Sequence, residues 1–325
     1  MSSATLSVVY IDELLTLLER SKIGCHINSV YVGAFVFADD ILLLSANRSG
    51  LQTMVNICQS FASERNLKFG TNDDPQKSKT KCIGFSKKRL VRDPAPVILA
   101  GTALPWVKKI SHLGCVLESD NSMKTDLIQK RGQFIGKVNS LLQEFHYTSS
   151  DIMFKLVDTY ATSCYGSSLW DLTSNDAEKL YKSWNVMVRN ILDLNRTTHR
   201  FLIEPLSGHL HLKTMLMSRL VAFHKGLVNS PKFTVRFLAR LVEKDMRTVL
   251  GKSLNFLVVE CGCQNVEDLS PSIVKKNLAY KMAPDDQTWQ VTLAQELFSV
   301  KNNDGAIDGF SDEEIRTLFN HVCTK

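Results

Sequence analysis

The spacing of apolar residues changes near residue 119, and this change separates two kinds of predicted structure. Before residue 119, short apolar runs alternate with turn-forming residues, which is typical of mixed strands and helices. The expected elements are helices over 12–21 and 50–66, two β arms in 30–45 around Asp39-Asp40, a loop over 70–75, a strand over 80–86 and short strands over 94–117.

After residue 119 the apolar positions follow helical spacing. Helices are predicted over 123–145, 152–169, 177–191, 211–228 and 233–250, with Asn175 and Glu178 as a capping pair for the third, and less regular structure from residue 251. The fold class is therefore α+β, with an antiparallel hairpin and short strands with helices in residues 1–118. Mainly helical regions are expected over 119–228 and 229–325.

Composition indicates a folded, soluble chain. Hydrophobic residues make up 44% of the 325 positions and charged residues 22%, which excludes disordered and collagen-like classes. The apolar stretches are far shorter than the roughly 20 residues that a bilayer requires. No Lys or Arg precedes residue 20, so a signal peptide is not expected. We expect an intracellular protein, in the nucleus or the cytoplasm, without a membrane partner.

The eight cysteines are scattered and form no C-x-x-C motif, which favours a reducing compartment. Cys261 and Cys263 together with His209 and His211 are the one combination that suggests a zinc site. Their spacing fits no common zinc pattern, so no structural zinc is predicted.

One segment holds the whole excess of positive charge. The chain has a net charge of +6, and the window 77–92 contains seven basic residues and no acid, so the remaining residues sum to −1. The basic residues are Lys77, Lys79, Lys81, Lys87, Lys88, Arg89 and Arg92. A solvated face and a phosphate-binding strip are both consistent with such a run.

The Asp39-Asp40 pair lies between two apolar arms. Neighbouring side chains of a strand point to opposite faces, so both acids cannot face one core, and burial without partners would be costly. An exposed hairpin turn explains the pair by itself. A second interpretation is a metal site, in which the carboxylates hold Mg²⁺ and the ion orients phosphates.

The segment from Val36 to Leu43, which contains Phe37-Ala38-Asp39-Asp40, resembles the Y/F-A-D-D hairpin, motif C, of reverse transcriptases. After a helix that contains Phe61, and Leu67-Lys68-Phe69, the run from Lys77 to Phe85 resembles motif D of LINE-type (non-LTR) retrotransposon reverse transcriptases, with its Lys-Thr-Lys.

Other segments are similar in the same order, over roughly residues 6–250. They are Tyr10 to Leu15 for the helix after motif B, Leu104 to Val107 and His112-Leu113-Gly114 for the primer grip, and Tyr165 to Trp170 with the helix through Trp184 for the thumb.

The resemblance implies a partial palm in residues 1–118 followed by a thumb-like region. It implies that Asp39 is a direct metal ligand and Asp40 a supporting acid, with Mg²⁺ or Mn²⁺ as the cofactor. Lys79 and Lys81 match the motif D lysines near the triphosphate, and both remain candidates because Lys77-Ser78-Lys79 and Lys79-Thr80-Lys81 overlap. The implied partners are an RNA template and an RNA/DNA primer duplex, which the basic strip and Trp106 would contact.

The chain departs from the family pattern at its start. No fingers region, motif A aspartate or Gln-Gly segment precedes residue 10. Because two-metal catalysis needs carboxylates on both sides of the ions, we expect a truncated reverse transcriptase that does not polymerise alone. The alternative is a non-catalytic RNA- or DNA-binding module, or a helical interaction module.

Overall fold

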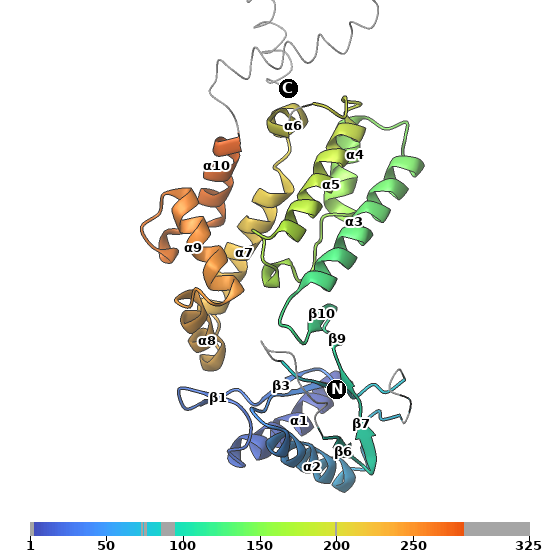
Figure 1. Cartoon of the computed structure of the whole chain (residues 1–325), viewed down its shortest axis with the longest axis vertical. Coiled ribbons are helices and arrows are strands. Elements are labelled where there is room, and N and C mark those ends of the chain that lie inside the picture. The colour runs from blue at the N-terminus through green and yellow to red at the C-terminus, as the bar shows by residue number, and fades with distance from the viewer. Residues whose placement is uncertain (1–2, 73, 75–76, 86–94, 199, 283–325) are drawn as a thin grey trace, which may run out of the picture. The chain divides into compact units, whose positions relative to one another are not determined.

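The computed structural model describes residues 3–72, 74, 77–85, 95–198 and 200–282 (Figure 1). The described residues form a mixture of helices and short strands, which agrees with the α+β class at this coarse level. The chain divides into two compact units: Met1–Ser122 with the short stretch Lys232–Thr234 form the first, and Met123–Pro231 with the residues from Val235 form the second. The change in apolar spacing predicts a division between residues 118 and 119.

Two helices form the base of the first unit. They are α1 (Ser3–Arg20) and α2 (Arg48–Glu64). Asn47 caps the start of α2, and its side chain accepts a hydrogen bond from the backbone N–H of Gly50. Both expected helices are confirmed, although α1 begins nine residues before the expected Asp12. Their apolar faces meet in a shared core: Leu14, Leu18, Met54, Cys58 and Phe61.

The described strands pair two by two. Four pairs are antiparallel: β1 (His26–Ile27) with β2 (Val30–Tyr31), β3 (Ala34–Phe37) with β4 (Asp40–Leu43), β6 (Val97–Leu99) with β7 (Thr102–Leu104), and β9 (Lys109–His112) with β10 (Cys115–Glu118). The fifth pair, β5 (Cys82–Ile83) with β8 (Trp106–Val107), is parallel.

Two strand predictions need correction. The first β arm was expected to begin at Val30, but Val30–Tyr31 pairs with β1 and the arm begins at Ala34. The strand expected over 80–86 covers only Cys82–Ile83 among its described residues. The first arm begins at Ala34 because the chain before it has another partner, with the N–H of Val32 donating to the carbonyl of Cys25.

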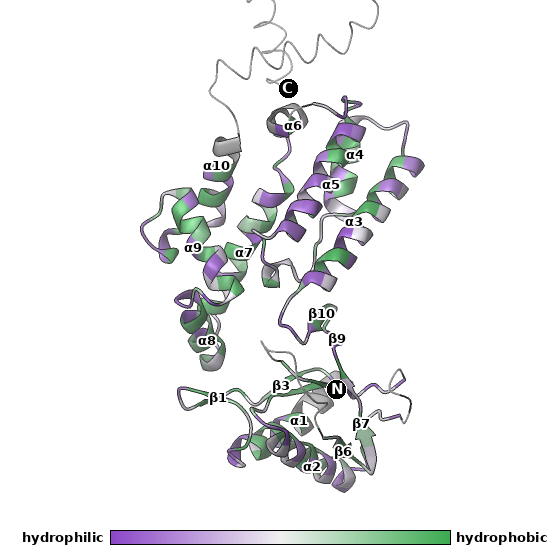
Figure 2. Ribbon diagram, in the orientation of Figure 1, coloured by the Kyte–Doolittle hydropathy of each residue, from purple (hydrophilic) through white to green (hydrophobic). Residues whose placement is uncertain are grey.

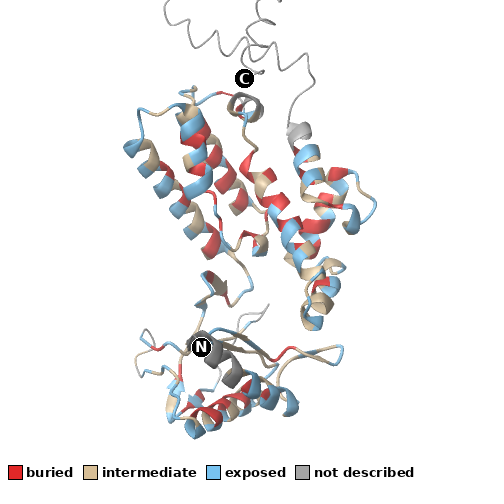
Figure 3. Cartoon of the chain, turned by 180° about the vertical axis from the view of Figure 1, so that it is seen from behind, coloured by how far each residue is buried: buried red, intermediate tan, exposed pale blue. Residues whose placement is uncertain are grey.

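The second unit is built from helices. They are α3 (Lys124–Glu144), α4 (Ser150–Tyr160), α5 (Asn175–Ile191), α6 (Arg200–Ser207), α7 (Leu212–Val228), α8 (Phe233–Glu243), α9 (Val249–Cys261) and α10 (Pro271–Met282), with short 3₁₀ turns η1 (Ser167–Leu169) and η2 (Val266–Asp268). Their buried faces show as red bands in Figure 3. One apolar cluster contains Phe134, Trp184 and Leu216 as well as Leu254 and Val274, so the helices on both sides of residue 228 share a core.

Three helix boundaries differ from the predicted ones. The helix expected over 152–169 ends at Tyr160, before Cys164 and Gly166 take the left-handed backbone conformation. The helix expected over 233–250 is two helices, because Thr248 accepts from the N–H of Gly251 and starts α9. The residues after 251, expected to be irregular, complete α9 and form α10.

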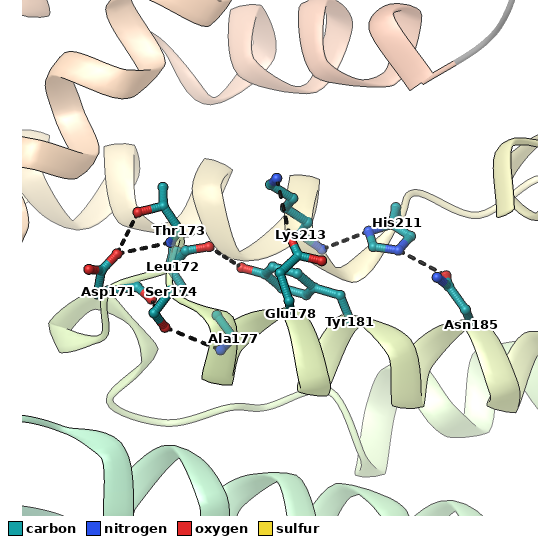
Figure 4. A network of polar contacts seen from close by, with 10 residues as sticks. All are labelled: Asp171, Leu172, Thr173, Ser174, Ala177, Glu178, Tyr181, Asn185, His211 and Lys213. Carbon is teal, nitrogen blue, oxygen red and sulfur yellow. Dashed lines mark hydrogen bonds and ion pairs between the residues drawn. The ribbon is translucent and has the colours of Figure 1, made fainter.

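The capping prediction for α5 is wrong by one residue. Ser174 is the N-cap, and its hydroxyl accepts from the N–H of Ala177. Figure 4 shows this cap at one end of a polar network that continues along α5 to α7. In that network the hydroxyl of Tyr181 donates to the carbonyl of Leu172, and His211 bridges Asn185 and the backbone of Lys213.

The long helices α3 and α5 carry both hydrophilic and hydrophobic positions (Figure 2). Within the described ranges, no helix combines the length and the apolar character that a membrane crossing would require.

Candidate functional site

The hairpin β3–β4 places the two predicted acids at a tight turn. Phe37 pairs with Asp40, so Ala38 and Asp39 are the two turn residues. Ala38 has a φ of 54°, a left-handed conformation that costs a non-glycine residue roughly 1 kcal/mol. Asp39 and Asp40 are both exposed, as the sequence analysis expected for a hairpin tip.

The opposite end of the hairpin is fixed to the helical base. Ala34 and Leu43, which pair at that end, pack against the core that α1 and α2 share. The N–H of Leu44 donates to the carbonyl of Gly33 at 2.7 Å, and the N–H of Cys25 donates to the carbonyl of Leu44 at 2.9 Å. The acidic tip is therefore carried by a hairpin with a rigid attachment, while its own side chains face solvent.

The acidic tip fits a metal site only in part. Mg²⁺ is commonly held by one or two carboxylates together with water and substrate phosphates. Asp39 and Asp40 supply two adjacent, exposed carboxylates at the turn. Among the described residues, no group of three His, Cys, Asp or Glu side chains is arranged to hold a metal. The hairpin would therefore need phosphate oxygens or a further carboxylate to complete coordination.

The predicted lysines lie in the loop that leads to β5. Lys79 is exposed and Lys81 is half-buried, and the stem of Lys79 lies close to Gly70, where an added Cβ would approach it to 3.1 Å. Lys77 forms an ion pair with Asp74, with 3.7 Å between Nζ and Oδ2. Within the described part of the chain, no ion pair joins Lys79 or Lys81 to the acids of the hairpin tip.

The parallel pair β5–β8 brings together two segments that were singled out separately. Cys82 pairs with Trp106, and the N–H of Cys82 donates to the carbonyl of Pro105 at 2.9 Å. Trp106 is half-buried, packs against the apolar cluster around Val97, and donates its indole N–H to the carbonyl of Ala95 at 3.3 Å. The strand that follows Lys81 therefore lies directly beside the predicted primer-grip segment.

Four predicted nucleic-acid contacts cannot be placed. Lys87, Lys88, Arg89 and Arg92 lie in 86–94, outside the described residues.

The hairpin β9–β10 carries the His112-Leu113-Gly114 segment. Leu113 and Gly114 occupy its turn, with φ values of 47° and 76°, the pattern that a type I′ turn requires. Opposite each other at the far end, Lys109 and Glu118 form an ion pair of 3.1 Å.

The second unit carries a cationic surface that the sequence reasoning missed. Lys130 and Lys137, one heptad apart on α3, line a shallow depression with Gln133, Ser163 and the exposed Tyr165. The apolar stripe of this helix predicts core residues only. The signal for the cationic surface in the sequence is the pair Lys130 and Lys137, which lie beside the apolar stripe of α3.

The same depression contains a buried thiol. Burial raises the pKa of Cys164 to about 11, although the nearby cations Arg219, Lys137 and Lys130 lower it. The thiol is therefore protonated near neutral pH and is not a nucleophile. The three cations around it make this surface electropositive.

No family model matches the chain, and no curated protein matches it with statistical significance.

Proposed function

We propose that this chain is a palm-and-thumb segment of a LINE-type reverse transcriptase. Its proposed activity is binding to an RNA template and to the primer duplex on that template. The observation that carries the proposal is the acidic hairpin. Two exposed carboxylates stand at a two-residue turn, and the other end of the hairpin is held by a helical core.

The turn itself is an ordinary one by its backbone. Ala38 has a φ of 54°, and Ala100 and Leu113 take the same left-handed conformation in the turns of the other hairpins. The support for the proposal therefore comes from the exposed acids and not from the backbone of the turn.

The pairing of distant segments also supports the proposal. The motif D-like run and the primer-grip-like Trp106 are separated in sequence but adjacent in the β5–β8 pair. A nucleic acid that contacts the exposed Lys79 would therefore lie close to β8. Lysine side chains beside a strand can contact the phosphates of a nucleic acid without reading its sequence.

A bound Mg²⁺ or Mn²⁺ would supply charge neutralisation at the transferred phosphates. Asp39 and Asp40 would hold it from the hairpin tip, and Lys79 or Lys81 would offset negative charge on the phosphates. Since the matched segments contain no motif A aspartate, the 325-residue chain by itself is proposed to bind without efficient extension.

Primer extension on an RNA template tests the proposal. The purified chain is assayed with Mg²⁺ or Mn²⁺ beside two variants, Asp39→Ala and the control Glu144→Ala, which removes an exposed acid at the end of α3. Duplex affinity is measured on the same samples at several salt concentrations.

We expect salt-dependent duplex binding and no extension. If the wild-type chain extends the primer, and this extension is lost in Asp39→Ala and kept in Glu144→Ala, the chain has a working catalytic site. That result would contradict the proposal that the chain binds without extending the primer. Absence of duplex binding would contradict the nucleic-acid assignment altogether.

A non-catalytic nucleic-acid-binding module is the second candidate. The specific observation that favours it is the cationic surface of Lys130, Lys137 and Arg219, which needs no metal. Calorimetric titration of Mg²⁺ into the protein–duplex complex separates the two candidates. Heat of binding that disappears in Asp39→Ala supports the reverse-transcriptase hairpin, whereas unchanged heat supports the simple module.

A further inference from the structure

A groove of about 250 Å³ runs between α3 and α5 in the second unit. Phe134, Val138 and Met187 form its buried floor. Ile135 is half-buried beside them, and Val186 remains 54% exposed. The two helices run parallel here, since Arg131 Nε donates to Ser183 Oγ near the start of the groove and Asn139 and Asn190 line its end. An apolar groove between parallel helices is suited to an amphipathic helix.

The polar rim of the groove is asymmetric. Arg131 and Lys182 stand near its beginning, and Asn139 and Asn190 near its end. No acidic side chain is among the residues that line it. An occupant with negative charge at one end and apolar residues along one side would therefore match both the charge and the floor.

The sequence of residues 283–325, outside the described part of the chain, has this chemistry. It contains eight acidic and three basic residues, a net charge of −5 in a chain of net charge +6. Ser311 and Glu314 have the spacing of a capping box, and Phe310 and Ile315 that of a hydrophobic staple. Apolar residues then follow at helical spacing: Ile315, Leu318, Phe319 and Val322.

We propose that residues 311–322 of the same chain dock in the α3–α5 groove. The apolar stripe from Ile315 to Val322 would extend about 10 Å as a helix, and the groove from Arg131 to Asn139 extends about 12 Å. Asp312, Glu313 and Glu314 would then lie beside the cationic end.

The connection is long enough for this docking. The helix α10 ends at Met282 within the same unit, and residues 283–310 reach at most about 90 Å when extended. A single domain of this size is only about 40 Å across, so the segment can reach the groove from any point on the unit. Docking within one chain also benefits from a high effective concentration.

Zero-length carbodiimide cross-linking of the full chain tests the proposal. Lys182 is the reactive amine at the groove, and Asp312, Glu313 and Glu314 are the expected carboxylates, with the linked peptides identified by mass spectrometry. A mixture of ¹⁴N- and ¹⁵N-labelled protein distinguishes links within one chain from links between chains. Lys182→Gln removes the amine and verifies the assignment.

Two variants of the C-terminal segment provide the matched comparison. Phe319→Asp places a charge on the apolar stripe, and Thr317→Asp places the same charge on the opposite side of the predicted helix. We expect the cross-link yield to fall about tenfold in Phe319→Asp, because a carboxylate facing the apolar floor is strongly disfavoured, and to stay near the wild-type value in Thr317→Asp.

A link within one chain that follows this pattern supports the proposal. Three outcomes would overturn it: no link to Lys182, equal yields in the two variants, or links only between differently labelled chains. Circular dichroism of each variant verifies that the folded helices are retained, since the two substitutions lie outside the described core.

Discussion

Trp170 Nε1 donates a hydrogen bond of 2.7 Å to Asp126 Oδ2, and both residues are buried in the second unit. The bond joins the first turn of α3 to the segment that ends η1, two parts of the chain that are 44 residues apart. A buried carboxylate retains its place only when polar partners replace the water it has lost. Trp170 therefore fills space in the core and also donates a hydrogen bond to the buried carboxyl group of Asp126.

The first prediction concerns this bond. Trp170→Phe keeps a large aromatic ring but removes the indole N–H, so we expect a loss of about 2–3 kcal/mol in the free energy of unfolding of the second unit. Urea denaturation followed by circular dichroism measures it. Asp126→Asn in the otherwise wild-type chain is the control, because an amide oxygen still accepts from the indole of Trp170. A loss below about 0.5 kcal/mol, the range of ordinary surface substitutions, would show that the bond is not structural.

The second prediction concerns pH. The N–H of Lys213 donates to Nδ1 of His211, so the ring carries its proton on Nε2 and donates it to Asn185 (Figure 4). Burial, with smaller effects of Lys213 and Arg200, lowers the pKa of His211 to about 4 from its ordinary value near 6.5. Protonation would remove the acceptor that caps α7.

The sign follows from the lowered pKa. Between pH 6.5 and 4 the unfolded chain binds the proton and the folded chain does not, so stability is present above pH 6.5 and is lost as the pH falls toward 4. The loss from this residue is about 3 kcal/mol. Burial raises the pKa of Glu204, which acts in the opposite direction. His211→Asn retains a cap and should flatten this part of the pH profile, as measured by urea denaturation. An identical profile in the variant would contradict the assignment.

The third prediction concerns the strained turn. Ala38→Val should destabilise the first unit by about 1–2 kcal/mol, because a β-branched side chain tolerates a left-handed backbone worse than alanine does. Ala38→Gly should leave the stability within about 0.5 kcal/mol, since the relief of strain is offset by the greater freedom of glycine in the unfolded chain. Hydrogen exchange of α2 and of the β3–β4 hairpin reports on this unit separately. Equal effects of the two substitutions would indicate that Ala38 is not held at a positive φ.

The fourth prediction concerns phosphate contacts. Replacing both Lys79 and Lys81 by alanine should lower duplex affinity and reduce the slope of log K against log salt by about 1–2, because each phosphate contact releases about one counterion. Lys244→Ala, in the exposed segment between α8 and α9, is the matched control and should leave the slope unchanged. Fluorescence anisotropy over a range of salt concentrations measures both. A slope that is unaffected in the double variant would remove these lysines from the nucleic-acid surface.

Much of the local structure could be predicted from the spacing of residues. The stripe of α2 and the two arms around Asp39-Asp40 depend on neighbours within a few positions, so their pattern is visible in the sequence. Errors occurred where a local pattern was interrupted by a side chain with a specific partner. Thr248 ends one predicted helix and starts another because its hydroxyl caps Gly251, which apolar spacing alone does not reveal.

The sequence by itself determined the α+β class, the acidic hairpin and the basic run, because these depend on residue type and on periodicity along the chain. Only the tertiary structure decided that β5 lies parallel to β8, that His211 is a neutral cap, and that Lys130, Lys137 and Arg219 surround Cys164. Each of these relationships depends on contacts between separate segments of the chain, such as that of His211 with Asn185. Their energies come from burial and from pairing across the core, which no local pattern contains.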